Sequence, residues 1–178
     1  NFTLEGKKMK PVRLIAAACN NLGIGKDGQL PWLWSYLRLC WYSCPHCLFP
    51  MKNTLHAVLS KTLSAAPDHA HFLCRDFESS VPLAALPPLA DVIETIWVVG
   101  GSRVYEEGLK HPWCDLVYLT DIMADFDCDV FFPQFDRKVF KIQDRFPGVP
   151  SEIQEENGIK YKFQVFKREI CDEEKETN

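Results

Sequence analysis

The chain has 178 residues and a formal net charge of −4, which is the size of one ordinary globular domain. Hydrophobic residues make up 47% of it and aromatic residues 12%, so it is richer in core-forming side chains than disordered, collagen-like or low-complexity sequences. No stretch of the sequence approaches the ~20 apolar residues that a transmembrane helix needs. These features predict a folded, cytoplasmic protein without a membrane partner.

Basic residues dominate the first third of the chain, where residues 1–67 hold only two acidic residues, Glu5 and Asp27. The lysines and arginines are scattered rather than clustered, and no RNA-binding motif accompanies them. The sequence therefore predicts no nucleic-acid partner. Residues 28–67 contain no Asp or Glu, so any carboxylate chemistry must come from elsewhere in the chain.

The first predicted element is a strand over residues 12–19, whose apolar run is typical of a strand buried on both faces. A glycine-rich loop follows over residues 20–32, and glycines at this density allow positive φ and close approach of the backbone to a ligand. An ordinary surface loop has the same composition. Residues 33–49 show no clean period and are assigned to no element.

Three further strands are predicted over residues 54–59, 70–74 and 94–99. A helix is predicted over residues 79–90, interrupted at Pro82 and at Pro87–Pro88. A second helix, over residues 103–109, directly follows Gly100, Gly101 and Ser102. Glycines before a helix leave its first N–H groups open to an anion such as pyrophosphate, although they also permit tight packing of a strand against a helix.

The C-terminal third is predicted to be rich in strands. Residues 115–122 alternate as a strand, and an acidic turn and a short strand follow over residues 124–133. Residues 137–170 contain two strands joined by a long loop, which predicts a C-terminal antiparallel hairpin.

Eight cysteines are present, and Cys40, Cys44 and Cys47 lie within one short segment. Cys44 and Cys47 form a CxxC pair, which in other proteins is a redox centre or half of a zinc site. No second ligand pair stands at suitable spacing, and Pro50 follows too soon for the long helix that a redox CxxC begins. We expect free thiols and no metal site, with a redox or metal protein as the remote alternative.

Several motifs, taken together, resemble the dihydrofolate reductase family of the vertebrate type. They are LIAAACNNLGIGKDGQLPW (residues 14–32), VLSK (58–61), WVVGGSRVYEEG (97–108), YLTDIMADFDCDVFFP (118–133) and PGVPSEIQEENGIKYKFQVF (147–166), in the family's order. The resemblance implies a single α/β domain over residues 9–170, with a central mixed, mostly parallel sheet flanked by helices. Residues 1–8 are then a leader and residues 171–178 a tail.

The resemblance implies an oxidoreductase of one-carbon metabolism that transfers a hydride from NADPH to 7,8-dihydrofolate, giving 5,6,7,8-tetrahydrofolate. The implied NADPH-binding residues fall into three groups, for the 2′-phosphate and adenine, for the nicotinamide and ribose, and for the pyrophosphate. They are Ser60, Lys61, Thr62 and Arg75; Ala17, Gly23, Ile24, Gly25, Lys26, Asp27, Gly28 and Gln29; and Gly100, Gly101, Ser102, Arg103, Val104 and Tyr105. The family joins the two glycines at 100 and 101 by a cis peptide bond.

The resemblance also implies a pterin pocket, in which Trp32 holds a water. Its lining residues are Ile15, Ala16, Leu30, Val99, Tyr105 and Thr120. Dihydrofolate and antifolates are the implied ligands, and the family implies a monomer.

The sequence departs from the family at the catalytic carboxylate. Family members carry this group five or six residues after the Trp, and here Leu37 and Arg38 stand at those positions. No catalytic residue is identified in its place, and loss of a general acid typically costs ~10²–10⁴ in rate. The segment over residues 33–49 is also shorter than in relatives and lacks a strand inside the sheet. We therefore expect the strands next to the missing one to lose a partner or to form a new pairing.

Three hypotheses follow from the resemblance and its departures. The first is an enzyme with the family's activity, in which Asp27 or a water replaces the acid. The second is a catalytically impaired pseudoenzyme that retains the Ser60–Lys61 and Gly100–Gly101 parts of an NADPH-binding module. The third is the CxxC redox or metal protein.

Overall fold

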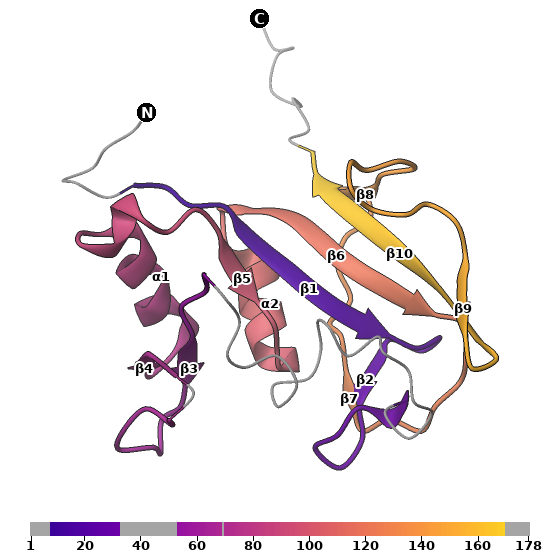
Figure 1. Cartoon of the computed structure of the whole chain (residues 1–178), viewed down its shortest axis with the longest axis horizontal. Helices are drawn as coiled ribbons and strands as arrows, with labels where there is room; N and C mark the ends of the chain where they lie inside the picture. The colour runs from indigo at the N-terminus through magenta and orange to yellow at the C-terminus, as the bar shows by residue number, and fades with distance from the viewer. Residues whose placement is uncertain (1–7, 33–52, 69, 170–178) are drawn as a thin grey trace, which may run out of the picture.

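The computed structural model describes residues 8–32, 53–68 and 70–169. In chain order, its elements are β1 (Val12–Ala18), β2 (Gly23–Gly25), β3 (Ala57–Leu59), β4 (Phe72–Cys74), α1 (Phe77–Ala85), the 3-10 helix η3 (Leu89–Asp91), β5 (Ile96–Val98), α2 (Ser102–Lys110), β6 (Cys114–Ile122), β7 (Val130–Phe131), β8 (Phe140–Ile142), β9 (Gln154–Glu156) and β10 (Ile159–Arg168). Figure 1 shows β1, β6 and β10 side by side, with α1, β3 and β4 at one end of the molecule. None of the described helices is long and apolar enough to cross a membrane.

A mixed sheet of six strands forms the centre of the fold, in the order β5-β1-β6-β10-β8, with β9 also paired to β10. β1 runs parallel to β5 and β6, whereas β10 runs antiparallel to β6, β8 and β9. The expected mixed central sheet is therefore confirmed. Two of its described strand pairs are parallel and three are antiparallel, so parallel pairs do not predominate as expected, and the parallel pair β3–β4 is separate from this sheet.

In the described part of the chain, the β3–β4 pair is not joined to the edge of the central sheet at β5. There, β5 pairs only with β1, and β3 pairs only with β4. Trp97 on β5 is 44% exposed, and Val99, the first residue after β5, is 48% exposed. The loss of a partner by the neighbours of the missing strand stays a prediction, because residues 33–52 lie outside the described part of the chain.

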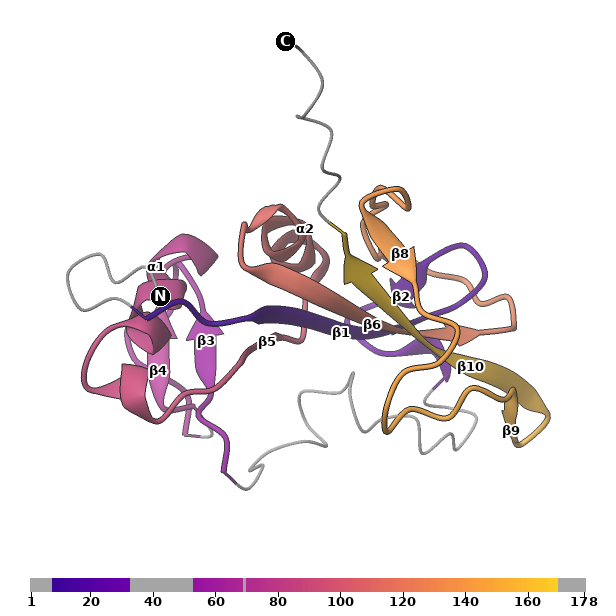
Figure 2. The same cartoon turned by 90° about the horizontal axis from the view of Figure 1, so that it is seen from above.

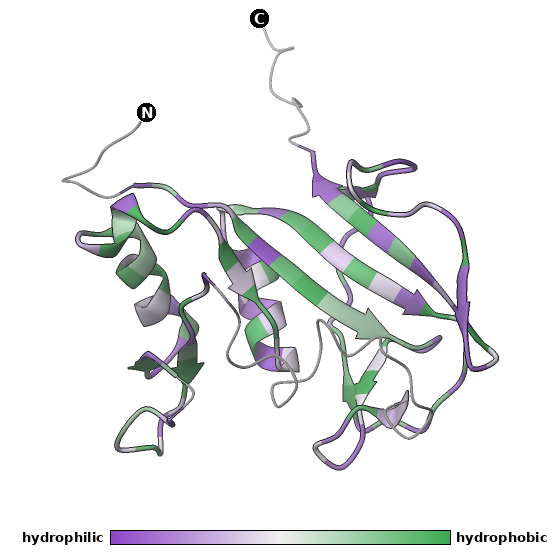
Figure 3. Ribbon diagram, in the orientation of Figure 1, coloured by the Kyte–Doolittle hydropathy of each residue, from purple (hydrophilic) through white to green (hydrophobic). Residues whose placement is uncertain are grey.

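One face of the central sheet packs against α2 and holds the larger core. Figure 2 shows α2 on this side of β1 and β6. Alternate residues of β1 pack in this core against side chains from α2, β5, β6 and later segments of the chain. Its buried members include Val12, Leu14, Ala16, Val98, Tyr105, Leu109, Val117, Leu119, Phe132 and Phe166. Figure 3 shows β1 and β6 as largely apolar, in keeping with this burial.

The opposite face holds a smaller cluster at the carboxyl end of β1. Its buried members are Ala17, Cys19, Leu30, Trp32 and Ile122. Nearer the start of β1, Arg13 and Ile15 are only half-buried, and Arg13 Nε lies 3.1 Å from Asp115 Oδ1. The prediction that this strand is buried on both faces is therefore wrong for its first half, because α2 covers only one face.

Helix α1 begins two residues earlier than predicted and continues through Pro82. Its N-cap is Asp76, whose Oδ1 accepts the Ser79 N–H at 2.8 Å. The predicted interruption at Pro82 is wrong, because a proline removes one backbone hydrogen bond while Phe77 and Val81 still anchor the helix in the core. The helix does end before the Pro87–Pro88 bond, which is cis.

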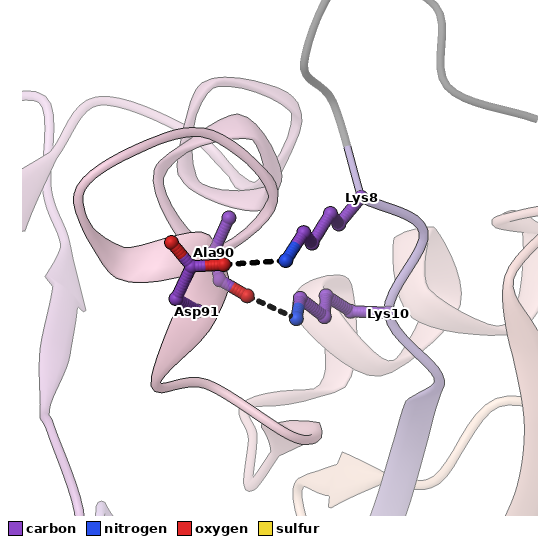
Figure 4. A network of polar contacts seen from close by, with 4 residues as sticks. All are labelled: Lys8, Lys10, Ala90 and Asp91. Carbon is purple, nitrogen blue, oxygen red and sulfur yellow. Dashed lines mark hydrogen bonds and ion pairs between the residues drawn. The ribbon is translucent and has the colours of Figure 1, made fainter.

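The segment before β1 ties α1 and η3 to the central sheet. The Lys8 N–H donates to Ala85 O at 2.8 Å, and the Lys8 ammonium forms an ion pair with Asp91. Lys10 is buried, and its Nζ donates to Ala90 O at 2.5 Å. Figure 4 shows both lysines reaching the same turn. We call this segment, residues 8–10, the strap.

The predicted C-terminal hairpin is confirmed, with β10 as its long strand. β8 pairs with the end of β10, and β9 pairs with its start. Asn157 and Gly158 both have positive φ in the tight turn between β9 and β10. An Asn-Gly pair is a strong signal for such a turn, yet β9 was not among the predicted strands.

Candidate active site

The loop over residues 20–29, after β1, contains a tight hairpin turn. Lys26 and Gln29 exchange both backbone hydrogen bonds, at 2.8 and 2.9 Å. Asp27 and Gly28, at the centre of the turn, both have positive φ, which is the pattern of a type I′ turn. The turn gives this loop, which we call loop 20–29, a defined backbone conformation.

The acidic loop over residues 125–129 holds loop 20–29 in place. Lys26 forms an ion pair with Asp127 (Nζ to Oδ2, 3.2 Å), and this hydrogen-bonded partner raises the pKa of Lys26. The Asp27 N–H donates to Asp129 Oδ2 at 3.0 Å, and the Asp129 N–H donates to Gly25 O at 2.9 Å. The sequence did not reveal this role of Asp127 and Asp129, because the contacts join residues far apart in the chain.

The start of α2 follows β5 through a Gly100–Gly101 peptide bond that is cis, as the resemblance implies. Gly101 is the N-cap, and no side chain caps the helix. The first helical N–H groups, those of Ser102, Arg103 and Val104, therefore have no acceptor within the helix. Ser102 Oγ donates to Phe131 O at 2.6 Å, so the helix begins beside β7. Such a helix start can bind an anion.

The turn after β3 brings Ser60, Lys61, Thr62 and Arg75 together. Ser60 Oγ accepts the N–H groups of Thr62 and Leu63, at 3.3 and 3.1 Å. Arg75 Nη1 donates to the carbonyl oxygens of Ser60 and Leu63, at 3.2 and 2.9 Å. Arg75 thus holds the turn in shape, while the Lys61 side chain is exposed to solvent.

Several residues predicted for the pterin pocket lie on the sheet face opposite α2. Ala17 is the register partner of Thr120, and Leu30 and Trp32 are buried in the same cluster as Ala17. Ile15 lies two residues before Ala17 on the same face of β1. The Trp32 side chain is fully buried, and its Nε1 has no hydrogen-bond acceptor among the described residues.

Ala16 and Tyr105, also predicted for this pocket, have their side chains in the core on the α2 side. Ala16 therefore offers only its backbone to a ligand on the opposite face. The Tyr105 hydroxyl donates to Ile15 O at 2.8 Å, and burial raises the pKa of this hydroxyl. A Cβ atom at Gly100 would lie 3.4 Å from the Tyr105 hydroxyl. Tyr105 thus packs directly behind both Ile15 and Gly100.

Two carboxyl groups near the sheet could replace the family acid, and neither is well placed. Asp27 is exposed at the tip of loop 20–29 rather than in an apolar environment. Burial raises the pKa of Asp121, but Asp121 is the register partner of Ala18 and so points away from the face that holds Trp32.

Two sets of predicted residues fall outside the described part of the chain. They are the family's acid positions, Leu37 and Arg38, and the CxxC pair, Cys44 and Cys47. Within residues 8–32, 53–68 and 70–169, no three potential metal ligands come together.

A cavity of about 240 Å³ lies at the carboxyl end of β1. Its lining residues are Ala18, Cys19, Asn20, Leu22, Leu119, Asp121, Arg137 and Gln164. The Arg137 guanidinium stacks over the rings of Phe135 and Phe166, at 4.0 and 4.4 Å, and burial lowers its pKa. None of the predicted site residues lines this cavity.

A mixed sheet, an uncapped helix start after two glycines and an exposed basic turn are typical of α/β proteins that bind phosphate-bearing cofactors. Comparison with known proteins identifies the family. The model of the dihydrofolate reductase family matches residues 40–168. Dihydrofolate reductase of Rattus norvegicus is 37% identical over 184 residues, covering 90% of this chain and 98% of the rat protein. That of Gallus gallus is 34% identical over 186 residues, covering 91% of this chain and 98% of the chicken protein.

A solved structure gives the same result for the fold. Schistosoma mansoni dihydrofolate reductase matches with a TM-score of 0.72 at 26% identity, covering 91% of this chain and all of that one. The chain therefore belongs to the dihydrofolate reductase family, which is a family of oxidoreductases. The rat alignment spans 184 positions, more than the 178 residues of this chain, so the rat protein holds residues with no counterpart here.

Proposed function

We propose that this chain catalyses the NADPH-dependent reduction of 7,8-dihydrofolate to 5,6,7,8-tetrahydrofolate. Family membership carries the proposal, because the match runs through most of the chain. NADPH, when bound, supplies the hydride for C6 of dihydrofolate. The chain's own residues bind the two ligands, orient them and provide for the proton at N5.

The residues for NADPH lie on three elements whose chemistry fits the cofactor. Lys61 would bind the 2′-phosphate, since an exposed ammonium beside the hydroxyls of Ser60 and Thr62 suits a phosphate. The uncapped start of α2 would bind the pyrophosphate. Ala17 and loop 20–29 would border the nicotinamide and its ribose.

The pterin would bind on the face of the sheet that holds Trp32. Its lining residues would be Ile15, Leu30, Val99 and Thr120, with the Ala16 backbone. Trp32 would hold the water that carries the proton to N5, because its buried Nε1 has no acceptor among the described residues. Without a carboxylate at residues 37 and 38, we expect turnover ~10²–10⁴ slower than with one.

The purified full chain tests the proposal in an assay of NADPH oxidation with and without dihydrofolate. We expect slow, dihydrofolate-dependent oxidation, with tetrahydrofolate identified by mass spectrometry. The melting temperature should rise with NADPH and rise further with methotrexate, since a ligand at a hundredfold excess over its Kd adds ~2.7 kcal/mol. If NADPH stabilises the chain but no tetrahydrofolate forms, the result contradicts catalysis. The hypothesis of an NADPH-binding module then remains.

The Lys61→Gln variant tests the 2′-phosphate site. We expect its Kd for NADPH to rise by about 10–100-fold, because a charge-assisted hydrogen bond contributes roughly 1.5–3 kcal/mol. Its Kd for NADH, which lacks that phosphate, should stay nearly unchanged. The measurement is a fluorescence titration with each cofactor. Lys167→Gln, at an exposed position of β10, is the matched control and should bind both cofactors as the unmodified chain does.

We also infer that the protein is a cytoplasmic monomer, without a nucleic-acid or membrane partner. The family resemblance supports the monomer, and the scattered basic residues support the absence of a nucleic-acid partner. Light scattering on a size-exclusion column tests the monomer, and a dimer mass would contradict it.

A further inference from the structure

Two cysteine thiols are in contact where loop 20–29 leaves β1. Cys19 Sγ lies 3.7 Å from Cys128 Sγ, although the two residues are 109 positions apart in the chain. Asn21 Oδ1 lies 3.1 Å from Cys19 Sγ and accepts the Gly23 N–H at 3.1 Å. Neither cysteine has a part in the proposed hydride transfer, so their contact is unexplained by it.

The packing around these thiols permits a disulfide bond. The S–S distance of a disulfide is about 2.0 Å, so the sulfurs must approach by about 1.7 Å, which is within reach of side-chain rotation. Gly23 leaves the space that Cys128 fills, since a Cβ atom there would lie 2.3 Å from Cys128 Sγ. Cys19 lines the cavity of about 240 Å³, and Cys128 is partly exposed and so accessible to a reagent.

We propose that Cys19 and Cys128 form a reversible disulfide that ties the acidic loop to the end of β1, where loop 20–29 begins, and thereby slows the exchange of NADPH. The oxidant is a low-molecular-weight disulfide such as oxidised glutathione. The effect on NADPH rests on the proposed function, because loop 20–29 is where we place the nicotinamide and ribose. The formation of the disulfide does not depend on it.

The reaction is two successive thiol–disulfide exchanges. The Cys128 thiolate attacks one sulfur of the oxidant, which forms a mixed disulfide and releases one thiol. Cys19 then attacks the Cys128 sulfur, which forms the Cys19–Cys128 bond and releases the second thiol. Two electrons pass from the cysteines to the oxidant, and the two cysteine protons end on the released thiols.

The reduced Cys19–Cys128 pair reacts slowly with oxidants at neutral pH. Burial and the neighbouring Cys19 thiol raise the pKa of Cys128 to about 11, so little thiolate is present at neutral pH. The existing ties between the two loops are the exposed Lys26–Asp127 ion pair and single hydrogen bonds such as that of Asp27 N–H to Asp129. Water competes with these contacts, whereas a covalent bond would hold the acidic loop persistently at the point where loop 20–29 begins.

The test uses the full chain with Cys40, Cys44, Cys47 and Cys171 replaced by serine, to remove pairing with thiols outside the described residues. After treatment with oxidised glutathione, non-reducing peptide mapping should show the Cys19–Cys128 bond. The Tm should rise by about 5–10 °C and fall back on reduction with dithiothreitol. The stopped-flow dissociation rate of NADPH should fall by about threefold or more.

Two further variants of this background control the experiment. Cys128→Ser should lose all three responses, with Cys128→Ala as a second version in case the serine hydroxyl disturbs the packing. Cys74→Ser, at a buried cysteine of β4, should keep all three. A different pairing, or no disulfide, overturns the proposal. A mapped Cys19–Cys128 bond that leaves NADPH dissociation unchanged overturns its regulatory part. If the reduced chain binds no NADPH, that result contradicts the proposed function. The peptide map and the Tm then test the formation of the disulfide by themselves.

Discussion

Gly23 and Gly25 lie in the same short strand, β2, yet their surroundings differ sharply. A Cβ atom at Gly23 would lie 2.3 Å from Cys128 Sγ and 2.9 Å from Asn21 Oδ1. A Cβ atom at Gly25 would lie 3.5 Å from Val130 Cβ, which is an ordinary contact. We therefore expect Gly23→Ala to lower the free energy of unfolding by about 1–3 kcal/mol, through overpacking.

The matched variant Gly25→Ala should change the free energy of unfolding by no more than about 0.5 kcal/mol. Urea unfolding of both variants, followed by circular dichroism, measures the difference. Equal destabilisation by the two substitutions would contradict the tight packing of Gly23 against Cys128.

At the scale of one element, helix α1 depends on its cap, and this makes its stability sensitive to pH. Asp76 Oδ1 accepts the Ser79 N–H at 2.8 Å, and the hydrogen bonds from the Ser79 backbone and side chain lower the pKa of Asp76. A carboxyl whose pKa is lower in the folded state stabilises that state above its unfolded pKa, about 3.9. This stabilisation is lost as the pH falls through the folded pKa.

The Asp76→Asn variant keeps a hydrogen-bond acceptor at the cap but cannot titrate. We expect its Tm to match that of the unmodified chain near neutral pH and to fall less steeply below about pH 4. Asp76→Ala, which removes the acceptor, should have the lower Tm at neutral pH. Melting curves followed by circular dichroism across this range give the comparison. Parallel pH profiles for the Asp and Asn forms would show that the cap does not contribute to acid sensitivity.

For the molecule as a whole, the strands that carry an apolar run or a clear alternation could be predicted from the sequence. The apolar runs at β1 and β5, the alternation at β6 and β10, and the glycines before α2 are local patterns that need no knowledge of the partner. The pairing of β2 with β7 and the separation of β3–β4 could not be predicted, because a strand's own pattern does not specify which strand lies beside it.

The same distinction applies to the candidate site. Resemblance predicts binding roles for Lys61, Gly100 and Gly101, since each stands within a recognisable motif. It did not identify the contact of Cys19 with Cys128 or the tie of Lys26 to Asp127, because those partners are about a hundred residues apart and meet only in the folded chain. Nor did the motifs show that Ala16 faces the α2 side, which follows from the register of β1 with β6.

The division of the strands into separate sheets predicts uneven stability across the molecule. β6 and β10 are paired on both edges, whereas β3 and β4 each have one partner within the described residues. Local opening of β3–β4 therefore breaks fewer contacts than opening of the central sheet. In native-state hydrogen exchange, we expect amides of β3 and β4 to exchange at least about tenfold faster than those of β6, a difference of roughly 1.4 kcal/mol.

Substitutions in the strap can lower the stability of α1, β3 and β4 selectively. Lys10 is 9% exposed and its Nζ donates to Ala90 O, so Lys10→Met removes a buried hydrogen bond between the strap and η3. We expect this change to speed exchange in α1, β3 and β4 while leaving β6 and β10 slow. Lys8→Met removes only an exposed ion pair with Asp91 and should change little, because such pairs contribute little to stability. Uniform exchange across all strands, or equal acceleration of β6 by Lys10→Met, would mean that β3–β4 unfolds only together with the central sheet.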